Sequence, residues 1–154
     1  MREHEIQTSP IRHLPLDPAI CVESGTSLHD VIARMREGHA SCVLICKENR
    51  CLGIFTERDY LNKVLSTPGT DRLKPIDDFM TSEPKTLGPE NTVGTAVRMM
   101  SEFGFRNIPL VDSAGNCTRL LQIRNIIQFL AELYPEEVLN VQPRREAFQQ
   151  PDGA

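Results

Sequence analysis

The chain has 154 residues, of which 40% are hydrophobic and 25% charged, a composition typical of one globular domain or of two small ones that share a core. Lys and Arg total 17 against 21 Asp and Glu, and the resulting net charge of −4 argues against a protein that grips nucleic acid or an anionic membrane. No apolar run approaches the roughly 20 residues of a membrane span, and the polar N-terminus does not resemble a secretory signal. We therefore expect a cytoplasmic protein with no nucleic-acid or membrane partner.

The first half of the chain predicts strand, helix, strand, turn, strand and helix. Apolar runs at residues 19–22, 43–46 and 52–55 are typical of short strands. Two helices show one apolar stripe each, the first formed by Leu28, Val31, Ile32 and Met35, the second by Tyr60, Leu61, Val64 and Leu65. A loop rich in Pro, Gly, Ser and Thr follows at residues 66–75.

The second half repeats this order of elements. A shift of 65 positions brings the first helical stripe onto Val93, Ala96, Val97 and Met100, and the strands onto 84–87 and 108–111. The second turn is one residue longer, so the later strand and helix match at an offset of 66. One copy alone is too small to bury a core. We therefore predict an α+β fold of two tandem strand-helix-strand-strand-helix repeats, packed with pseudo-two-fold symmetry and leaving a ligand cleft between them.

The predicted division of the chain follows the repeats. Residues 1–66 hold an N-terminal segment and the first repeat, 67–83 a linker, 84–134 the second repeat, and 135–154 a C-terminal extension with a mobile tail.

Five cysteines without a C-x-x-C pair indicate buried structural thiols rather than a disulfide framework. A metal or redox site made from Cys42, Cys46 and Cys51 is the alternative, although their spacing matches no zinc-binding pattern. The four histidines are scattered without ligand spacing, so we predict no metal site.

The run Gly53–Asp59 joins a strand directly to a helix and has two compatible interpretations. In the structural one, Thr56 caps the helix and Asp59, three residues later, completes a capping box. In the functional one, the helix start attracts a phosphate, the Asp59 carboxylate accepts bonds from ribose hydroxyls, and Arg58 adds a cation. Gly53 then lets a ligand approach the strand backbone.

The duplication, the run Gly53–Asp59 and the run Phe79–Pro84 together resemble a pair of cystathionine-beta-synthase (CBS) domains, also called a Bateman module. The segment Phe105–Asp112 is similar to the second-strand pattern of that family. The resemblance covers roughly residues 10 to 134. Single motifs are short, and their order, spacing and duplication carry the match.

The resemblance implies a regulatory module that binds an adenosine nucleotide in the cleft and commonly forms a dimer. Thr56 and Asp59 would contact phosphate and ribose, with Ile54 and Arg58 in the same run. Adenine would lie against strand residues of the first repeat, which by position are Ile20, Cys21, Cys42 and Val43.

The second copy departs from the family pattern. Arg119 replaces the glycine, Gln122 the threonine and Asn125 the aspartate. A neutral amide is a weaker partner for ribose than a carboxylate, so we expect one competent site and one degraded site. Arg106 and Arg124 would face a phosphate across the cleft, or else be ordinary surface charges.

These observations favour a stand-alone regulatory protein that binds AMP, with ATP or S-adenosylmethionine as further candidates, and signals to an unknown effector protein as a homodimer. The nucleotide is a regulatory ligand, and no cofactor is required. The alternative is a ligand-free dimeric interaction scaffold. Nothing in the sequence resembles a catalytic triad or nucleophile elbow, so we predict that the chain is not an enzyme.

Overall fold

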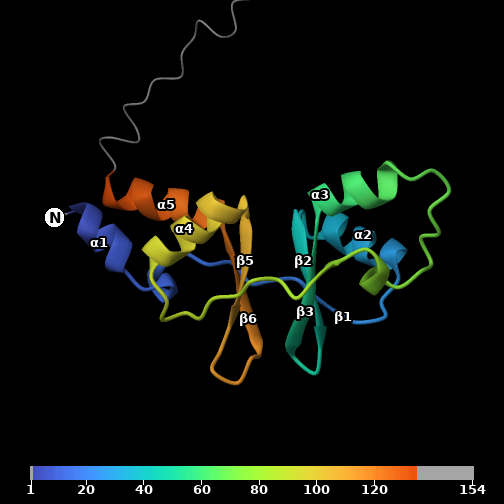
Figure 1. Ribbon diagram of the computed structural model, residues 1–154, viewed down its shortest axis with the longest axis horizontal. Coiled ribbons are helices and arrows are strands. Elements are labelled where there is room, and N and C mark those ends of the chain that lie inside the picture. Colours follow the sequence, from blue (N-terminus) through green and yellow to red (C-terminus); the bar gives the residue numbers. More distant parts are fainter. Residues whose placement is uncertain (1, 135–154) are drawn as a thin grey trace, which may run out of the picture.

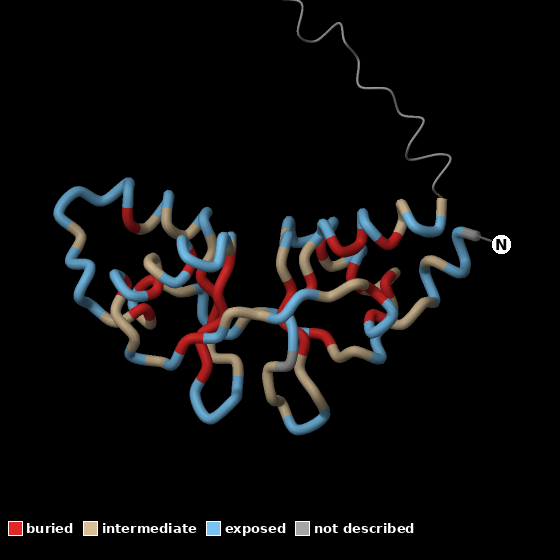
Figure 2. Tube along the Cα trace, turned by 180° about the vertical axis from the view of Figure 1, so that it is seen from behind, coloured by how far each residue is buried: buried red, intermediate tan, exposed pale blue. Residues whose placement is uncertain are grey.

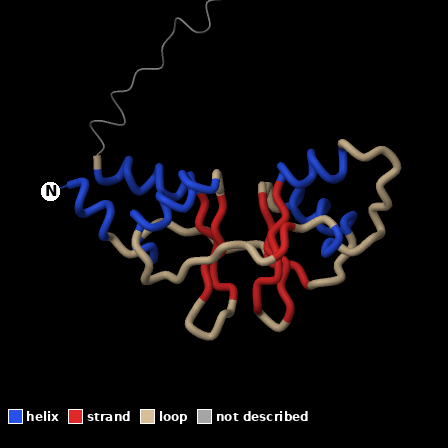
Figure 3. The backbone as a smooth tube through the Cα atoms, in the orientation of Figure 1, coloured by secondary structure: helices blue, strands red, loops and turns tan. Residues whose placement is uncertain are grey.

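The computed structural model describes residues 2–134, apart from the side chains of Arg2 and Thr118. Two similar α+β halves lie side by side, with their strands in the middle of the molecule and their helices toward the two ends (Figures 1 and 3). The predicted C-terminal extension, residues 135–154, lies outside the described residues. Among residues 2–134, none of the helices combines the length and the apolar character that a membrane crossing needs.

The first repeat forms a four-stranded sheet in the order β1-β2-β3-β4. β1 (Cys21–Glu23) runs parallel to β2 (Cys42–Lys47), and β3 (Arg50–Thr56) and β4 (Thr81–Ser82) continue the sheet antiparallel. Helix α2 (Leu28–Glu37) follows β1, and α3 (Glu57–Asp59) follows β3 and continues as one π-helical segment, η2 (Tyr60–Leu65).

The second repeat has the same order of elements with a smaller sheet. Helix α4 (Val93–Phe103) precedes the antiparallel hairpin of β5 (Asn107–Val111) and β6 (Cys117–Gln122), and α5 (Ile123–Leu133) follows. The strand predicted at 84–87 is reduced to one parallel bridge between Leu87 and Leu110. Pro84 has no N–H to donate, and Gly88-Pro89 follow at once, so pairing does not extend in either direction.

The N-terminal segment packs against the second repeat, although it precedes the first repeat in the chain. Helix α1 (Arg2–Thr8) and the 3₁₀ turn η1 (Ile11–His13) fall within residues 1–66, which the sequence analysis grouped with the first repeat. Instead Ile11 is fully buried in the core of the second repeat, and Ile11 N donates to Asn91 O at 2.8 Å.

The segment between the repeats shows the converse arrangement. A second 3₁₀ turn, η3 (Ile76–Asp78), brings the fully buried Ile76 and the neighbouring Phe79 into the core of the first repeat. Strand β4, also predicted as linker, pairs with β3. The Pro-Ile pair at residues 10 and 11 recurs 65 positions later at 75 and 76. Each repeat therefore takes its 3₁₀ turn from the chain segment that precedes the other repeat.

Three groups of buried side chains hold the described part of the chain together. Each repeat has its own apolar core, and the buried segments follow the strands and the inner sides of the helices (Figure 2). A third group lies between the two sheets and consists of Cys42, Leu44, Cys46, Ile54 and Leu120, with Ala19, Cys51 and Cys117 packed against it. This layer joins the repeats, and its two ends differ in chemistry.

We expect Ile11→Ala to lower the free energy of unfolding by about 2–5 kcal/mol, because it opens a cavity in the core of the second repeat. Chemical denaturation measures the change. The matched control is Leu73→Ala, since Leu73 is 78% exposed and its loss should change stability by less than about 0.5 kcal/mol. Equal stability of the two variants would mean that the N-terminal segment is not part of that core.

Candidate functional site

A cleft of about 610 Å³ lies between the repeats, at the edge where β3 and β6 end and the next helices begin. Both helix starts, α3 and α5, lie on the same side of the molecule (Figure 1). The lining comes from Ser41 and from residues within the segments 54–59, 81–85, 103–107 and 122–124. Both repeats therefore contribute to one site.

Thr56 and Asp59 form the capping box that the sequence predicts. Thr56 N donates to Asp59 Oδ2 at 3.0 Å, and Asp59 N donates to Thr56 Oγ1 at 3.3 Å. Thr56 Oγ1 also donates to the same carboxylate oxygen at 3.2 Å. The carboxylate is thereby held in one orientation at the cleft wall.

The second oxygen of Asp59 has partners from outside the box. Thr81 Oγ1 donates to Oδ1 at 3.2 Å, and Lys63 Nζ lies 3.2 Å from the same atom. Lys63 also donates to Phe79 O at 2.8 Å. The Asp59 side chain is only 13% exposed, because Thr81 and Lys63 cover its second oxygen. The capping box and the predicted ribose contact therefore both involve the Asp59 carboxylate.

The cleft is more basic than the chain as a whole. Its charged lining consists of four basic residues, Arg58, Lys85, Arg106 and Arg124, and three acidic ones, Glu57, Asp59 and Glu83. Among the described residues, the side chains of Arg58 and Arg106 make no hydrogen bond or ion pair. These two exposed guanidinium groups are available to an anion.

An aromatic surface lines the side of the cleft that belongs to the second repeat. The rings of Phe103 and Phe105 stack with centroids 5.5 Å apart and an interplanar angle of 20°. Lys85 Nζ lies 4.4 Å from the centroid of Phe103. Phe103 is 46% exposed, which is costly for such a large ring unless something covers it. The surface suits a flat, partly polar group.

The structure brings together seven of the residues selected from sequence. Ile54, Thr56, Arg58, Asp59, Arg106, Gln122 and Arg124 all line the cleft. Their roles toward a ligand stay predictions.

The strand residues of the first repeat that were selected to hold adenine do not line the cleft, and neither does Asn125. Val43 is fully buried in the first core, and Cys42 is buried between the sheets. Ile20 packs against the first core, while Cys21 is exposed on β1. The helix start of the first repeat faces the second repeat, so the corresponding positions there, Lys85 and Asn107, line the cleft instead.

Position 53 needs a glycine for a different reason from the one predicted. A Cβ at this position would stand 2.3 Å from Met80 Sδ and 3.0 Å from Thr81 O. The glycine is therefore required by the close approach of β4 to β3, and Gly53 does not line the cleft.

Several lining residues were missed from sequence, notably Glu83, Lys85, Phe103 and Phe105. Glu83, Lys85 and Phe105 lie in loops and Phe103 is the last residue of α4, so no local pattern selects them. The only available signal was the repeat itself, because shifting Ile20 and Cys42 by 65 positions leads to Lys85 and Asn107.

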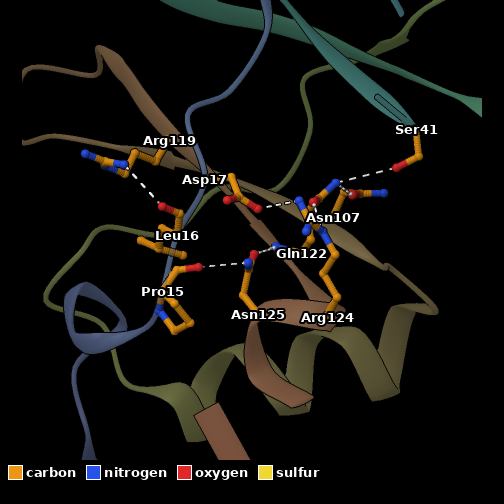
Figure 4. A network of polar contacts seen from close by, with 9 residues as sticks. All are labelled: Pro15, Leu16, Asp17, Ser41, Asn107, Arg119, Gln122, Arg124 and Asn125. Atoms are coloured by element: carbon orange, nitrogen blue, oxygen red, sulfur yellow. Dashed lines mark hydrogen bonds and ion pairs between the residues drawn. The ribbon is translucent and has the colours of Figure 1, made fainter. Parts of the chain in front are cut away.

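The second half of the pseudo-symmetric site is occupied by the chain itself (Figure 4). Asn125 is 1% exposed, accepts from Gln122 N at 2.8 Å and donates to Pro15 O at 3.0 Å. Gln122 Nε2 donates to Asn107 Oδ1 at 3.2 Å and reaches Ser41 Oγ, across the interface, at 3.5 Å. The Asn125 amide thus connects the second repeat to the N-terminal segment.

Two arginines reinforce that connection (Figure 4). Arg124 pairs with Asp17 and donates from Nε to Gln122 Oε1 at 2.7 Å. Arg119, which stands where Gly53 stands in the first repeat, donates to Leu16 O at 3.3 Å. Arg124 therefore lines the cleft with its charge already paired.

The cysteines differ in their surroundings. Cys42 and Cys46 are buried, as the sequence indicates, whereas Cys51 and Cys117 are half-buried and Cys21 is exposed. Burial raises the pKa of the Cys42 thiol, so it stays protonated. Within residues 2–134, no group of three or more His, Cys, Asp and Glu side chains is arranged to hold a metal ion.

Comparison with known proteins places this geometry in a family. The CBS domain profile matches the chain twice, over residues 11–66 and 76–132. An uncharacterized 17.7 kDa protein of Acidianus ambivalens is 29% identical over 114 residues, covering 73% of this chain and 68% of that protein. The chain spans between about half and two thirds of the length of three curated relatives that it matches.

Solved structures share the fold. The CBS domain protein PAE2072 from Pyrobaculum aerophilum, complexed with AMP, gives a TM-score of 0.70 at 20% identity, covering 80% of this chain and 99% of that one. The CBS domain pair of protein MJ0100, in complex with 5'-methylthioadenosine and S-adenosyl-L-methionine, gives 0.71 at 19% identity, covering 82% and 98%. With the profile matching both halves of the observed fold, the chain belongs to the CBS domain family and carries a tandem pair of CBS domains.

Proposed function

We propose that this CBS pair is a regulatory module that binds an adenosine nucleotide in the cleft between its repeats. The observation that carries the proposal is one cleft that combines the fixed Asp59 carboxylate, an exposed aromatic surface and two arginines that have no partner among the described residues. Its volume of about 610 Å³ lies within the range of about 300–1,000 Å³ typical of small-molecule sites. Structures of similar fold were solved with AMP and with S-adenosyl-L-methionine, which supports this ligand class.

Each part of the nucleotide has a complementary part of the cleft. Asp59 would accept hydrogen bonds from the ribose hydroxyls in place of Thr81 or Lys63. Arg58 and Arg106 would bind the phosphate, and the adenine ring would cover Phe103 and Phe105. The roles proposed for Ile54 and Thr56 are packing against the ligand and holding Asp59 in place.

AMP is the first candidate because the charge of its single phosphate matches that of the two cleft arginines that make no ion pair among the described residues. Arg58 and Arg106 make no ion pair among the described residues, whereas Arg124 is paired with Asp17. The longer chain of ATP would need Lys85 or Arg124 to leave its present partner. S-adenosylmethionine carries a sulfonium cation, which this basic cleft favours less.

The output would be a change in the relative position of the repeats, transmitted to an effector protein. Ligand and effector can be coupled only if the ligand has different affinities for two arrangements of the repeats. The cleft lies between the repeats, so a ligand that contacts both walls would gain or lose contacts when one wall moves relative to the other. We therefore infer a regulatory role rather than catalysis.

The exposed apolar residues favour a homodimer. Leu61 and Ile127 are each 57% exposed and occupy equivalent positions of the two repeats, 66 residues apart. Leu65 and Ile123 add exposed apolar surface on the same two helical segments. A second copy of the chain could cover both positions at once through its own symmetry. The same surface supports the alternative function, a dimeric interaction scaffold without a physiological ligand.

Asp59→Ala should weaken AMP binding by about 10- to 100-fold, the range expected for loss of hydrogen bonds to a charged group. Isothermal titration calorimetry measures the affinity. The matched control is Ser27→Ala, which removes the cap of α2 outside the cleft lining and costs about 1 kcal/mol of stability. No heat of binding for AMP, ATP or S-adenosylmethionine in the unmodified protein would favour the scaffold.

Arg106→Ala should lower the affinity for AMP by about 10-fold while leaving adenosine binding unchanged, because only the phosphate contact is lost. Competition experiments with both compounds give the two affinities. Arg98→Ala, at an exposed position of α4 outside the cleft lining, is the control and should behave like the unmodified protein. An equal loss for AMP and adenosine would assign Arg106 to another part of the ligand.

Ile127→Lys should shift the protein from dimer to monomer, because a charge would be buried in the proposed contact. Sedimentation velocity measures the mass. Leu73→Lys introduces the same charge at a more exposed residue in a loop and should leave the dimer intact. A monomeric unmodified protein would contradict the homodimer directly.

A further inference from the structure

Four of the five cysteines gather at one end of the layer between the two sheets. Cys21 comes from β1, Cys46 from β2, Cys51 from β3 and Cys117 from β6. Cys46 and Cys51 are direct partners in the β2–β3 ladder. The thiols of Cys117, Cys21 and Cys51 lie close enough to Cys46 to shift the pKa of its thiol. These four cysteines, although far apart in the sequence, form one group, which we call the thiol cluster.

The cluster connects the two repeats. An antiparallel bridge joins Arg50 to Asn116, and Cys117 N donates to Asn49 O at 2.8 Å. The first residues of β3 and β6 are therefore held against each other, near the hairpin turns at the lower end of the view in Figure 1. Cys51 and Cys117 pack against the same buried group at this junction, and each thiol shifts the pKa of the other.

Partial exposure distinguishes Cys51 and Cys117 from the buried Cys46, whose pKa is also lowered by neighbouring thiols. Hydrogen bonds from the thiols of Cys117 and Cys46 lower the pKa of Cys51, because they stabilise its thiolate. As a thiol, Cys51 Sγ instead donates to Gly53 O at 3.5 Å. The pKa of Cys117 is raised, since it serves as the donor to Cys46 and Cys51. Both residues are half-buried, which leaves a path for a small oxidant, whereas Cys42 and Cys46 are buried.

We propose that Cys51 and Cys117 form an oxidisable dithiol, and that a hydroperoxide converts it into a disulfide linking the two CBS repeats. A metal site is less consistent with this cluster, because the described residues contain no group of three or more ligands arranged around one point. The proposal does not depend on which ligand the cleft binds.

The chemistry balances with one hydroperoxide per disulfide. The Cys51 thiolate attacks a peroxide oxygen, so an S–O bond forms, the O–O bond breaks and hydroxide leaves. The Cys117 sulfur then attacks the Cys51 sulfur, the S–O bond breaks, and the hydroxyl leaves as water with the Cys117 proton. Two thiols lose two electrons and two protons, and hydrogen peroxide is reduced to two molecules of water. A dithiol reductant reverses the change.

The disulfide would fix the repeats at the end of the interface opposite the cleft. Cys51 precedes Thr56 by five residues along β3, a distance of about 17 Å at the usual strand rise. A covalent link there limits how far the repeats can separate. Oxidation would therefore restrict the motion that any ligand in the cleft has to use.

Peptide mapping of the full chain tests the proposal. The protein is treated with hydrogen peroxide, its remaining thiols are blocked with iodoacetamide, and it is digested with trypsin without reduction. Cleavage after Arg and Lys separates Cys51 on residues 51–58, Cys117 on 107–119, and Cys46 with Cys42 on 37–47. We expect a linked pair of the first two peptides, loss of two of the five free thiols, and a higher Tm that dithiothreitol reverses.

The variants separate the pair from the rest of the cluster. Cys51→Ser and Cys117→Ser should each abolish the link, and Cys21→Ser, the matched control within the cluster, should keep it. Thermal unfolding of the reduced variants shows that each is folded. Three results would overturn the proposal: a link between residues 37–47 and 51–58, oxidation to sulfinic acid without any link, or stoichiometric zinc binding that protects the thiols from peroxide.

Discussion

The packing of Ile11 into the second repeat and of Ile76 into the first ties the two halves together. Each core is completed by a segment that lies, in the chain, before the other repeat, so neither half can be separated without losing buried apolar surface. Pro10 bridges to Thr92 and Pro75 to Ser27 at equivalent positions, which anchors both segments next to the helix caps. The cleft and the thiol cluster both depend on this connection, because each is built from residues of both repeats.

The layer between the sheets has an apolar middle and two chemically distinct ends. Leu44, Ile54 and Leu120 bury the middle. At one end, helix starts and loops leave room for the basic cleft, and at the other the hairpins bring the thiols together. A ligand and an oxidant would therefore act on the same interface from opposite ends. Both would affect the same property, the position of one repeat relative to the other.

The two repeats differ at the position that is Asp59 in the first repeat and Asn125 in the second. Asp59 is held by its capping box and by Lys63 at the wall of an open cleft. Asn125 accepts the same backbone hydrogen bond from Gln122, but its amide nitrogen donates to Pro15 O and is buried. An amide can both donate and accept, and a carboxylate at neutral pH can only accept. The substitution therefore suits a contact with a backbone carbonyl, and the site has become asymmetric.

The sequence by itself determined the duplication, the order of strands and helices, and the capping box of Thr56 and Asp59. These features depend on periodicity or on residues three positions apart, and they are local. Only the tertiary structure decided that Ile11 completes the second core, that Lys85 and Phe105 rather than Ile20 and Val43 line the cleft with Asp59, and that Cys51 meets Cys117. Those contacts join residues tens of positions apart in loops and strand ends. The recurring Pro-Ile pair was visible, but which core each isoleucine enters is set by the way the two sheets pack, and no local pattern records that choice.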